Sequence, residues 1–289
     1  MDYFEPKNVP EALSTLAREG ESAKVIAGGT DVLVDMKFKE DPGCLVNIKR
    51  IPGLSFIREN GNSLLIGPMT TIREIETNNL VRERFSALWD AAHQFASLQI
   101  RNTATIGGNI CRASPSGEVL APLLVLGAKV RMAFEDGEKS ALLDSFFLAP
   151  GKTLLGSRGI LTAIEIPYPA ERTRSLYLKH AVRGAMDIAI VGVAILATRG
   201  SDDKHFSDVR IGLGAVAPTP IRAQRAEAIA QEKPFNQKQV QDAAKEAAAE
   251  SNPITDHRGS AEYRRWIVEA LTQKGLTALW EAGMENGGH

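Results

Sequence analysis

Cysteine is scarce in this chain of 289 residues, which contains only Cys44 and Cys111. Two thiols cannot by themselves ligate an iron–sulfur cluster or a structural zinc. The five histidines show no metal-ligand spacing, so we predict no metal site. Two cysteines give no disulfide framework either, and the simplest interpretation of both is a small buried side chain.

The chain also lacks an excess of either charge, a long apolar run and a leader-like start. Lys and Arg number 34 and Asp and Glu number 35, which leaves a net charge of −1. This balance gives no electrostatic case for binding nucleic acid or an anionic membrane surface. No stretch reaches the roughly 20 apolar residues of a spanning helix, and the N-terminus has no signal-peptide pattern. We therefore expect a cytoplasmic protein without a membrane span.

Familiar catalytic and nucleotide motifs are absent as well. The glycine-rich segments match neither the Gly-x-Gly-x-x-Gly fingerprint nor a P-loop. No Gly-x-Ser-x-Gly elbow occurs around Ser116, so hydrolase chemistry lacks its nucleophile signal. What is present is an ordinary globular composition with 44% apolar residues, enough to fill a sizeable core.

Length and element order favour two domains, since one domain takes roughly 100–200 residues. We predict a first domain over 1–170 with subdomains of about 1–53 and 54–170, a polar link over 170–175, and a C-terminal α+β domain over 175–285. Apolar periodicity and turn signals predict the elements. Asn60-Gly61 and Asp136-Gly137 predict hairpin turns, and Thr71 with Glu74 predicts a capping box. The predicted helices cover residues 10–19, 71–78, 84–96, 237–250 and 261–282, and a buried helix is predicted to start over 32–36. The predicted strands cover residues 23–27, 44–48, 55–58, 63–67, 129–134, 159–166, 176–181, 188–198 and 209–216.

Ala27-Gly28-Gly29-Thr30-Asp31 is a glycine-rich turn that follows a predicted strand and opens a predicted helix. Glycine lets the backbone approach a phosphate closely and adopt a positive φ. Backbone N–H groups at a helix start bind anions, helped by the helix dipole, and Thr30 adds a hydroxyl donor. This pattern predicts a phosphate-binding turn, and a tight strand-to-helix turn without a ligand is the alternative.

A second glycine pair lies in Thr105-Ile106-Gly107-Gly108-Asn109. Two such turns in one chain fit a diphosphate held from both sides, as a dinucleotide requires. Asn109 can both donate and accept hydrogen bonds, which suits polyol or phosphate oxygens.

Three further side chains are candidates at such a ligand. Phe95 could pack on an aromatic ring, with core packing as the alternative. Glu118 could accept hydrogen bonds from sugar hydroxyls, or it caps the apolar helix that begins at Val119. Lys179, on a predicted strand of the C-terminal domain, either reaches the ligand or is a solvated charge. One basic cluster is interpreted as a solvated helix face or a subunit contact: Arg258, Arg264 and Arg265.

Several strings in the sequence are similar to those of one family. The strings are Ala27-Gly28-Gly29-Thr30-Asp31, Arg101-Asn102-x-Ala104-Thr105-Ile106-Gly107-Gly108-Asn109, Ala113-Ser114-Pro115, Ile164-Glu165-Ile166-Pro167, and residues 214–223 and 259–264. They resemble the FAD-binding medium subunit of the molybdenum hydroxylases, a family that includes xanthine dehydrogenase and aerobic carbon monoxide dehydrogenase. The resemblance covers nearly the whole chain, and the string over 101–109 is highly specific.

The resemblance implies a fold like the vanillyl-alcohol-oxidase (PCMH-type) flavoproteins. Two N-terminal subdomains would hold FAD between them, and a smaller C-terminal α+β domain of the CO dehydrogenase flavoprotein type would cover one side. Glu118 stands where relatives usually have an Asp, whose side chain is one methylene shorter. The residues that the resemblance assigns to FAD are Val25, Ile26, Ala27, Gly28, Gly29, Thr30, Asp31, Val32, Phe95, Thr105, Ile106, Gly107, Gly108, Asn109, Glu118, Leu161 and Lys179.

The resemblance also implies an electron relay in an oxidoreductase. A large molybdenum-cofactor subunit would oxidise the substrate, and a small subunit with two [2Fe–2S] clusters would deliver electrons to this chain. This chain would pass them through FAD to NAD⁺ or a quinone, with no bond-breaking residue of its own. The three subunits would form a dimer of heterotrimers. Relatives resembling 4-hydroxybenzoyl-CoA reductase carry an extra cysteine-bound cluster in this subunit, for which two cysteines are too few.

Two alternatives belong to other classes of protein. One is a stand-alone flavin oxidoreductase with its own substrate, which would need a catalytic acid, base or tyrosine at the flavin, and the sequence identifies none. The other is a scaffold subunit that has lost the cofactor. The intact glycine pairs at 28–29 and 107–108 argue against that second alternative.

Overall fold

A computed structural model of the chain describes residues 1–38, 42–231 and 234–282. The backbone forms two compact units. The first comprises residues 1–75, 97–114 and 127–167, and the second comprises residues 76–96, 115–126 and 168 onward. No helix in the described ranges combines the length and apolar character that crossing a membrane requires.

Both units draw on the N-terminal half of the chain, because segments 76–96 and 115–126 pack with the C-terminal part. The predicted domains, 1–170 and 175–285, are each continuous in sequence, whereas each unit combines several segments. The domain bounds stay a prediction. The predicted end of the C-terminal domain at 285 lies outside the described residues.

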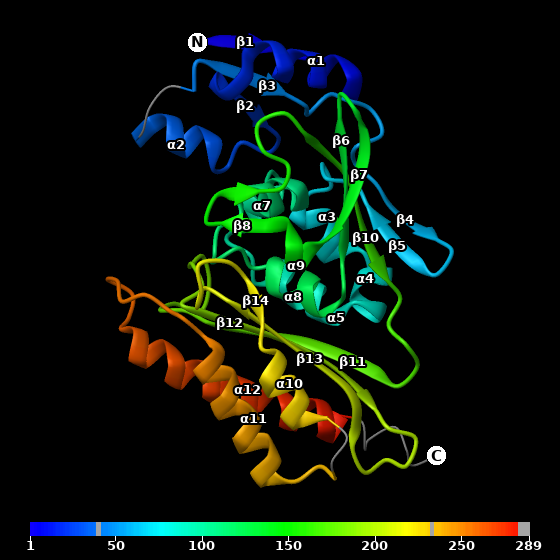
Figure 1. The fold of residues 1–289 in the computed structure, drawn as a ribbon, viewed down its shortest axis with the longest axis vertical. Helices are drawn as coiled ribbons and strands as arrows, with labels where there is room; N and C mark the ends of the chain where they lie inside the picture. Colours follow the sequence, from blue (N-terminus) through cyan, green and yellow to red (C-terminus); the bar gives the residue numbers. More distant parts are fainter. Residues whose placement is uncertain (39–41, 232–233, 283–289) are drawn as a thin grey trace. The chain divides into compact units, whose positions relative to one another are not determined.

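A three-stranded parallel sheet in the order β1-β3-β2 begins the first unit (Figure 1). Helix α1 packs an apolar stripe that includes Leu13 and Leu16 into the same core as Val46 of the central strand. The Asn8 side chain caps this helix by accepting the Glu11 N–H at 2.9 Å. The elements of this part are β1 (Asp2–Phe4), α1 (Val9–Glu19), β2 (Ala23–Ile26), α2 (Val32–Phe38) and β3 (Cys44–Asn47).

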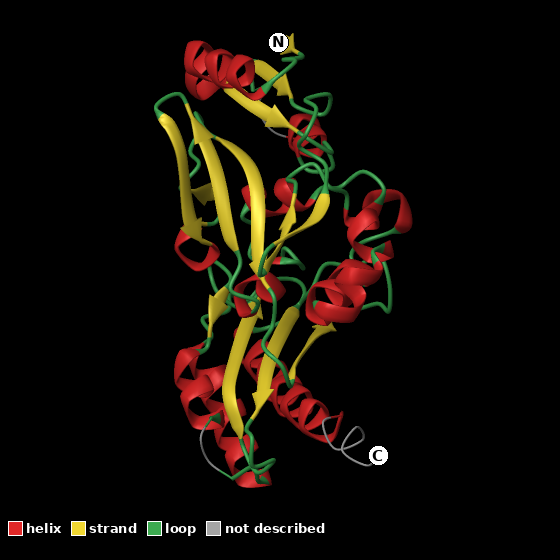
Figure 2. Ribbon diagram, turned by 90° about the vertical axis from the view of Figure 1, so that its right-hand side faces the viewer, coloured by secondary structure: helices red, strands yellow, loops and turns green. Residues whose placement is uncertain are grey.

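A five-stranded antiparallel sheet in the order β4-β5-β10-β6-β7 completes the first unit, and Figure 2 shows its long strands in yellow. The hairpins predicted at Asn60-Gly61 and Asp136-Gly137 are confirmed, and both glycines have positive φ. The strands are β4 (Ile57–Asn60), β5 (Ser63–Ile66), β6 (Lys129–Phe134), β7 (Gly137–Leu142) and β10 (Ile160–Pro167). The remaining elements are α3 (Ile72–Thr77), α6 (Leu98–Arg101), α7 (Ile106–Arg112), α9 (Leu143–Phe146), β8 (Phe147–Ala149) and β9 (Lys152–Thr153).

The second unit is built on an antiparallel sheet in the order β11-β12-β13-β14 with helices on both faces. Helices α10, α11 and α12 cover one face, and α5 and α8 cover the other (Figure 1). The central strand β12 is consequently buried along residues 191–197 and shows no polar alternation. The elements are α4 (Asn79–Arg84), α5 (Ser86–His93), α8 (Leu120–Val125), β11 (Thr173–His180), β12 (Val191–Arg199), β13 (Phe206–Gly214), β14 (Ile221–Arg222), α10 (Gln224–Ala230), α11 (Gln237–Glu250) and α12 (Ala261–Ala282).

The predicted elements are wrong in two places. The helix predicted over 84–96 is interrupted at Phe85, whose φ of −133° and ψ of 52° separate α4 from α5. The polar link over 170–175 ends early, because Thr173 already pairs with Thr198 in the sheet. In addition, the short elements β1, α4, α6, α7 and α10 were not predicted, since three to seven residues are too few to show a clear period.

The interpretation of Arg264 as a solvated residue is also wrong. Arg264 is 3% exposed, and its guanidinium donates to the Ile190 and Ala215 carbonyls at 2.8 and 3.1 Å and to Asp256 at 2.7 Å. It therefore joins three loops of the second unit.

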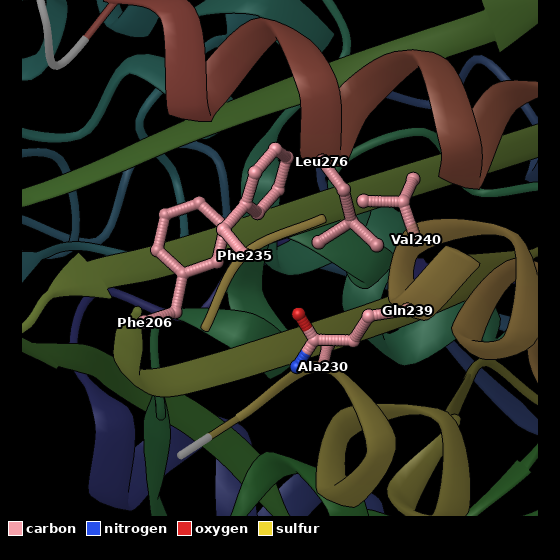
Figure 3. Close-up of a pocket in the computed structure, with 6 residues that line it drawn as sticks. All are labelled: Phe206, Ala230, Phe235, Gln239, Val240 and Leu276. Carbon is pink, nitrogen blue, oxygen red and sulfur yellow. The ribbon is translucent and has the colours of Figure 1, made fainter. Parts of the chain in front are cut away.

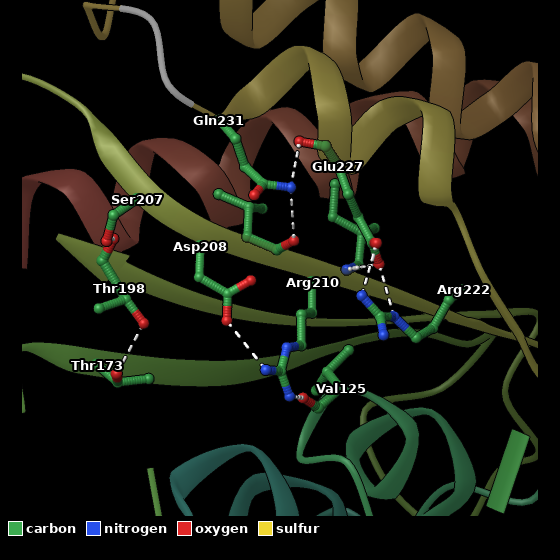
Figure 4. Close-up of polar contacts among 11 residues, drawn as sticks. Val125, Thr173, Thr198, Ser207, Asp208, Arg210, Arg222, Glu227 and Gln231 are labelled. Atoms are coloured by element: carbon green, nitrogen blue, oxygen red, sulfur yellow. Dashed lines mark hydrogen bonds and ion pairs between the residues drawn. The ribbon is translucent and has the colours of Figure 1, made fainter. Parts of the chain in front are cut away.

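A buried ion pair fixes α10 to its sheet (Figure 4). Glu227 is 4% exposed, and its carboxylate accepts hydrogen bonds from Arg222 at 2.9 and 2.7 Å. The Ile211 N–H donates to the same carboxylate at 2.8 Å. Three hydrogen bonds satisfy this buried carboxylate, and they attach α10 to strands β13 and β14.

The gap drawn in Figure 3 is part of the core of the second unit. It leaves no room for a water molecule, and two of its walls, the Phe206 and Phe235 rings, stack edge to face with centroids 5.7 Å apart. We interpret it as a packing gap. The lining residues are Phe206, Ala230, Phe235, Gln239, Val240 and Leu276.

The contact between β13 and α8 predicts different effects for two glycines on the same strand face. A Cβ at Gly212 would lie 2.7 Å from the Ala121 carbonyl oxygen, whereas a Cβ at Gly214 would meet only atoms 3.8 Å or more away. We expect Gly212→Ala to lower the free energy of unfolding by roughly 1–3 kcal/mol, the usual cost of overpacking. Gly214→Ala should change it by less than about 0.5 kcal/mol. Denaturant unfolding of both variants measures this, and equal effects would contradict the packing described.

A second prediction concerns the ion pair between Arg131 and Glu165 on β6 and β10. Hydrogen bonds from the Arg131 guanidinium lower the pKa of Glu165 from its ordinary value of 4.5. A lowered folded-state pKa stabilises the fold above the ordinary pKa, and this contribution is lost as pH falls through the folded-state value. Arg131→Gln should therefore lower Tm at pH 7, and its difference from wild type should shrink below pH 4.5. A difference that stays constant with pH in thermal unfolding would contradict this.

Candidate functional site

The first glycine turn joins β2 to α2, as predicted, and presents unpaired backbone donors. Gly29 has φ 79°, a conformation that favours glycine. Within the described part of the chain, no protein acceptor pairs with the backbone N–H groups of residues 28–31. Such a run of N–H groups forms an anion-binding concavity. Because α2 has only seven residues, the turn itself carries this property more than the helix dipole does.

Gly28 is required by a backbone-to-backbone contact. A Cβ at this position would lie 2.1 Å from the Thr103 carbonyl oxygen and 3.1 Å from the Ala104 Cα. The first turn therefore passes directly against the segment that leads into the second turn. Any larger residue at Gly28 would separate the two.

The second glycine pair differs from the first, because residues 106–109 form the first turn of helix α7 and their backbone donors are already occupied. The N–H groups of residues 106–109 donate, in order, to Thr70 O, Pro68 O, Thr105 Oγ1 and Thr105 O, at 2.9–3.0 Å. The free polar atom here is the Asn109 Oδ1, which is buried without a hydrogen-bond partner among the described residues. This turn can therefore contribute a side-chain acceptor and close backbone approach, while the amides come from the first turn.

A second group of predicted residues lies in the second unit. The Lys179 side chain is 7% exposed, and its ammonium donates to Glu118 Oε1 at 2.8 Å, to the Asp187 carbonyl at 2.7 Å and to the Gln94 carbonyl at 3.2 Å. All three ammonium protons thus have acceptors, and the alternative of a solvated charge at Lys179 is wrong. No side chain caps α8 through a hydrogen bond among the described residues, and the Glu118 carboxylate, one residue before its N-cap, accepts from Lys179 instead.

Burial controls the ionisation of the carboxyl and phenol groups around this ion pair. Burial raises the pKa of Glu118 above its ordinary range, and the neighbouring Lys179 ammonium opposes that shift. Burial also raises the pKa of Asp90, whose carboxylate accepts the Tyr177 N–H at 3.1 Å. The pKa of Tyr177 lies well above 10.0 because of burial and the nearby Glu118 charge, so its hydroxyl stays protonated.

The other two predicted side chains are largely inside their units. Phe95 is 7% exposed and follows Gln94, which links it to Lys179 in the second unit. Leu161 is 3% exposed on β10 of the first unit, at the start of a bulge in its pairing with β6.

The structure thus brings the predicted residues together in two sets. One set, residues 25–32, 105–109 and Leu161, lies in the first unit, and the other, Phe95, Glu118 and Lys179, lies in the second. The acceptors around Lys179 and the pairing of Arg112 with α2 were not predicted. These contacts join residues up to 85 positions apart and leave no local signal in the sequence.

Family models match most of the chain in two blocks. Residues 1–169 match the FAD binding domain in molybdopterin dehydrogenase, and residues 176–279 match the CO dehydrogenase flavoprotein C-terminal domain. The chain is 34% identical to the xanthine dehydrogenase FAD-binding subunit of Escherichia coli O157:H7 over 277 residues, which cover 94% of this chain and 93% of that one.

The chain belongs to this family of FAD-binding subunits.

A second relative agrees with this chain in sequence and in fold. This chain is 33% identical over 280 residues to the carbon monoxide dehydrogenase medium chain of Hydrogenophaga pseudoflava, with 96% of each chain covered. The structure of carbon monoxide dehydrogenase from that organism, lacking the Mo-pyranopterin moiety, matches with a TM-score of 0.94 at 35% identity and 97% coverage of both chains. The predicted family, the α+β fold class, the oxidoreductase class and FAD as cofactor are confirmed.

The residues present fit the chemistry of FAD. Diphosphate oxygens are acceptors, which the unpaired N–H groups of residues 28–31 require. Polyol hydroxyls are donors, which the buried Asn109 Oδ1 requires. The contact roles of the individual residues stay predictions.

The contact between Gly28 and Thr103 predicts the effect of one added methyl group. Gly28→Ala should push the first turn away from residues 103–104 and weaken FAD binding roughly tenfold or more, at least about 1.4 kcal/mol. A matched control is Gly61→Ala at a hairpin tip of the same unit, where φ is +58° and the space is open. The control should lose about 1 kcal/mol of stability and keep its FAD affinity. Flavin fluorescence titration measures both, and equal affinities for the two variants would contradict the contact.

Proposed function

We propose that this chain is the electron-transfer subunit of a molybdenum hydroxylase, accepting electrons from the [2Fe–2S] clusters of a small subunit and passing them to NAD⁺ or a quinone. The observation that carries the proposal is the run of unpaired N–H groups over 28–31 in a chain of this family. Bound FAD would supply one- and two-electron redox chemistry, which links single-electron clusters to a two-electron acceptor.

The protein's own contribution is binding and orientation. The N–H groups of residues 28–31 would donate to the diphosphate, and Asn109 Oδ1 would accept from a hydroxyl of the ribityl or ribose. Glycines at 28, 107 and 108 allow close contacts with Thr103, Pro68 and Thr105 that hold this backbone in place. The remaining residues assigned by resemblance, Val25 to Ala27, Val32, Phe95 and Leu161, would supply apolar walls.

Lys179 and Glu118 would act as a fixed polar pair near the cofactor. A ligand that accepts a hydrogen bond from Lys179 must replace one of its three existing acceptors. The pair would therefore orient the cofactor more than it would increase the affinity for it. The longer side chain of Glu118, compared with the Asp usual in relatives, reaches Lys179 directly at 2.8 Å. No residue here needs to break a substrate bond.

The proposed partners follow from the enzymes named among the relatives. A large molybdenum-cofactor subunit and a small [2Fe–2S] subunit would assemble with this chain as a dimer of heterotrimers in the cytoplasm. Names of relatives such as "medium chain" of carbon monoxide dehydrogenase support a multi-subunit enzyme. The domains would be 1–170 for FAD and 175–285 for the C-terminal part.

The decisive experiment joins cofactor binding to electron delivery. The FAD-loaded chain is mixed anaerobically with the reduced [2Fe–2S] subunit that co-purifies with it, and the flavin absorption band is followed. Bleaching that depends on the small subunit supports the relay. Direct bleaching by an organic substrate without any partner would favour the stand-alone oxidoreductase, and a folded chain that never retains FAD would favour the scaffold subunit.

Asn109 gives a residue-level prediction for the same site. Asn109→Leu removes the buried acceptor, and FAD should dissociate roughly tenfold more readily, because a ligand hydroxyl is left without its partner. Asn62→Ala, an exposed asparagine in the first unit, is the control and should bind FAD like wild type. An Asn109→Leu variant with wild-type affinity in a flavin titration would remove Asn109 from the binding site.

A further inference from the structure

Arg112 connects α7, which carries the second glycine pair, to α2 and the first glycine turn through an ion pair within the first unit. It is the last residue of α7, three positions after Asn109. Its Nη1 and Nη2 donate to the two carboxylate oxygens of Asp35 at 2.5 and 3.2 Å. Its Nε also lies 3.5 Å from Asp31 Oδ1. One guanidinium therefore contacts both the end of the first turn and the helix that follows it.

Burial does not hold helix α2 in place among the described residues. None of its residues is buried, and Leu33, Val34 and Phe38 are each more than half exposed, so the buried helix start predicted over 32–36 is wrong. A two-pronged Arg–carboxylate pair fixes direction as well as distance, which a single contact does not. The ion pair is thus placed to set the angle at which α2, and the turn before it, meets α7.

We propose that Arg112 is a positioning residue for FAD, holding the amides of residues 28–31 in register with the Asn109 side chain. This inference rests on the proposed function. Asp35 is the ion-pair partner of Arg112. Because its carboxylate neutralises the guanidinium, Arg112 acts through α2 and does not serve as the cation for the diphosphate. Preorganised donors bind more tightly because less ordering is needed when the ligand arrives.

Three variants of the full-length chain test the proposal: Arg112→Ala, Asp35→Asn and the double variant. FAD affinity is measured by flavin fluorescence titration of the cofactor-free protein. We expect each single variant to bind roughly three- to tenfold more weakly, and the double variant to be no weaker than the singles, because both remove one interaction. Arg112→Lys should recover only part of the affinity, since lysine lacks the fork.

The Asp35→Asn variant separates positioning from direct contact. If Arg112 bound the diphosphate itself, releasing it from Asp35 would preserve or increase affinity. That result, or unchanged affinity in Arg112→Ala, would overturn the proposal.

A matched ion pair in the same unit controls for general destabilisation. Arg131 and Glu165 have side-chain exposures of 42% and 27%, close to the 38% and 29% of Arg112 and Asp35. Arg131→Ala should lower Tm without changing FAD affinity. A loss of affinity in Arg131→Ala equal to that in Arg112→Ala would also overturn the proposal, since any lost ion pair would then suffice.

Hydrogen exchange of the cofactor-free protein provides a readout that does not involve FAD. Amide exchange over residues 28–38 should speed up in Arg112→Ala and Asp35→Asn but not in Arg131→Ala. If wild type itself bound no FAD, the proposed function would fail, and hydrogen exchange would still show whether the ion pair between Arg112 and Asp35 holds α2. Unchanged exchange in Arg112→Ala would overturn that role of the ion pair.

Discussion

Where the first glycine turn passes Thr103, two stretches of backbone approach so closely that no side chain fits between them. This approach places backbone N–H groups that have no acceptor among the described residues beside the segment that leads into α7. It depends on Gly28, and it is followed at once by Gly29 in a left-handed conformation. The consequence is a surface made of backbone N–H groups, whose directions are fixed by the fold and do not depend on rotamers.

The two glycine pairs look alike in sequence, yet they perform different tasks. At 107–108 the missing side chains allow contact with Pro68 and Thr105, which consume the local N–H groups. At 28–29 the missing side chains leave the N–H groups open. A diphosphate gripped equally from both sides, as the sequence pattern suggested, is therefore less consistent with the hydrogen bonds than one turn that donates and one that supports it and adds Asn109.

Local patterns predicted the elements that carry their own signals. The capping box at Thr71 and Glu74 is formed in both directions, at 2.7 and 3.1 Å, and the helices over 237–250 and 261–282 have the predicted bounds. The interruption at Phe85 was missed because Phe85 is itself apolar and continues the helical spacing of Leu88 and Ala92 in α5. The position of α5 and α8 on the sheet of the second unit was missed for another reason. Nothing in an apolar helix specifies which of two sheets it will cover.

The candidate site shows the same division between local and distant information. A glycine pair consists of consecutive residues, so both pairs were recognised from the sequence. Lys179 instead donates to Gln94, Glu118 and Asp187, which lie on three segments that only the fold brings together. A solvated charge was one of two alternatives for Lys179 and for the cluster that includes Arg264, and both side chains are buried. A buried cation must have partners, because desolvation costs more than an unpaired charge can recover. Lys179 joins the segments that carry two other candidate residues, Phe95 and Glu118. Arg264 instead joins three loops of the second unit that carry no candidate residue, so its contacts stabilise the fold alone.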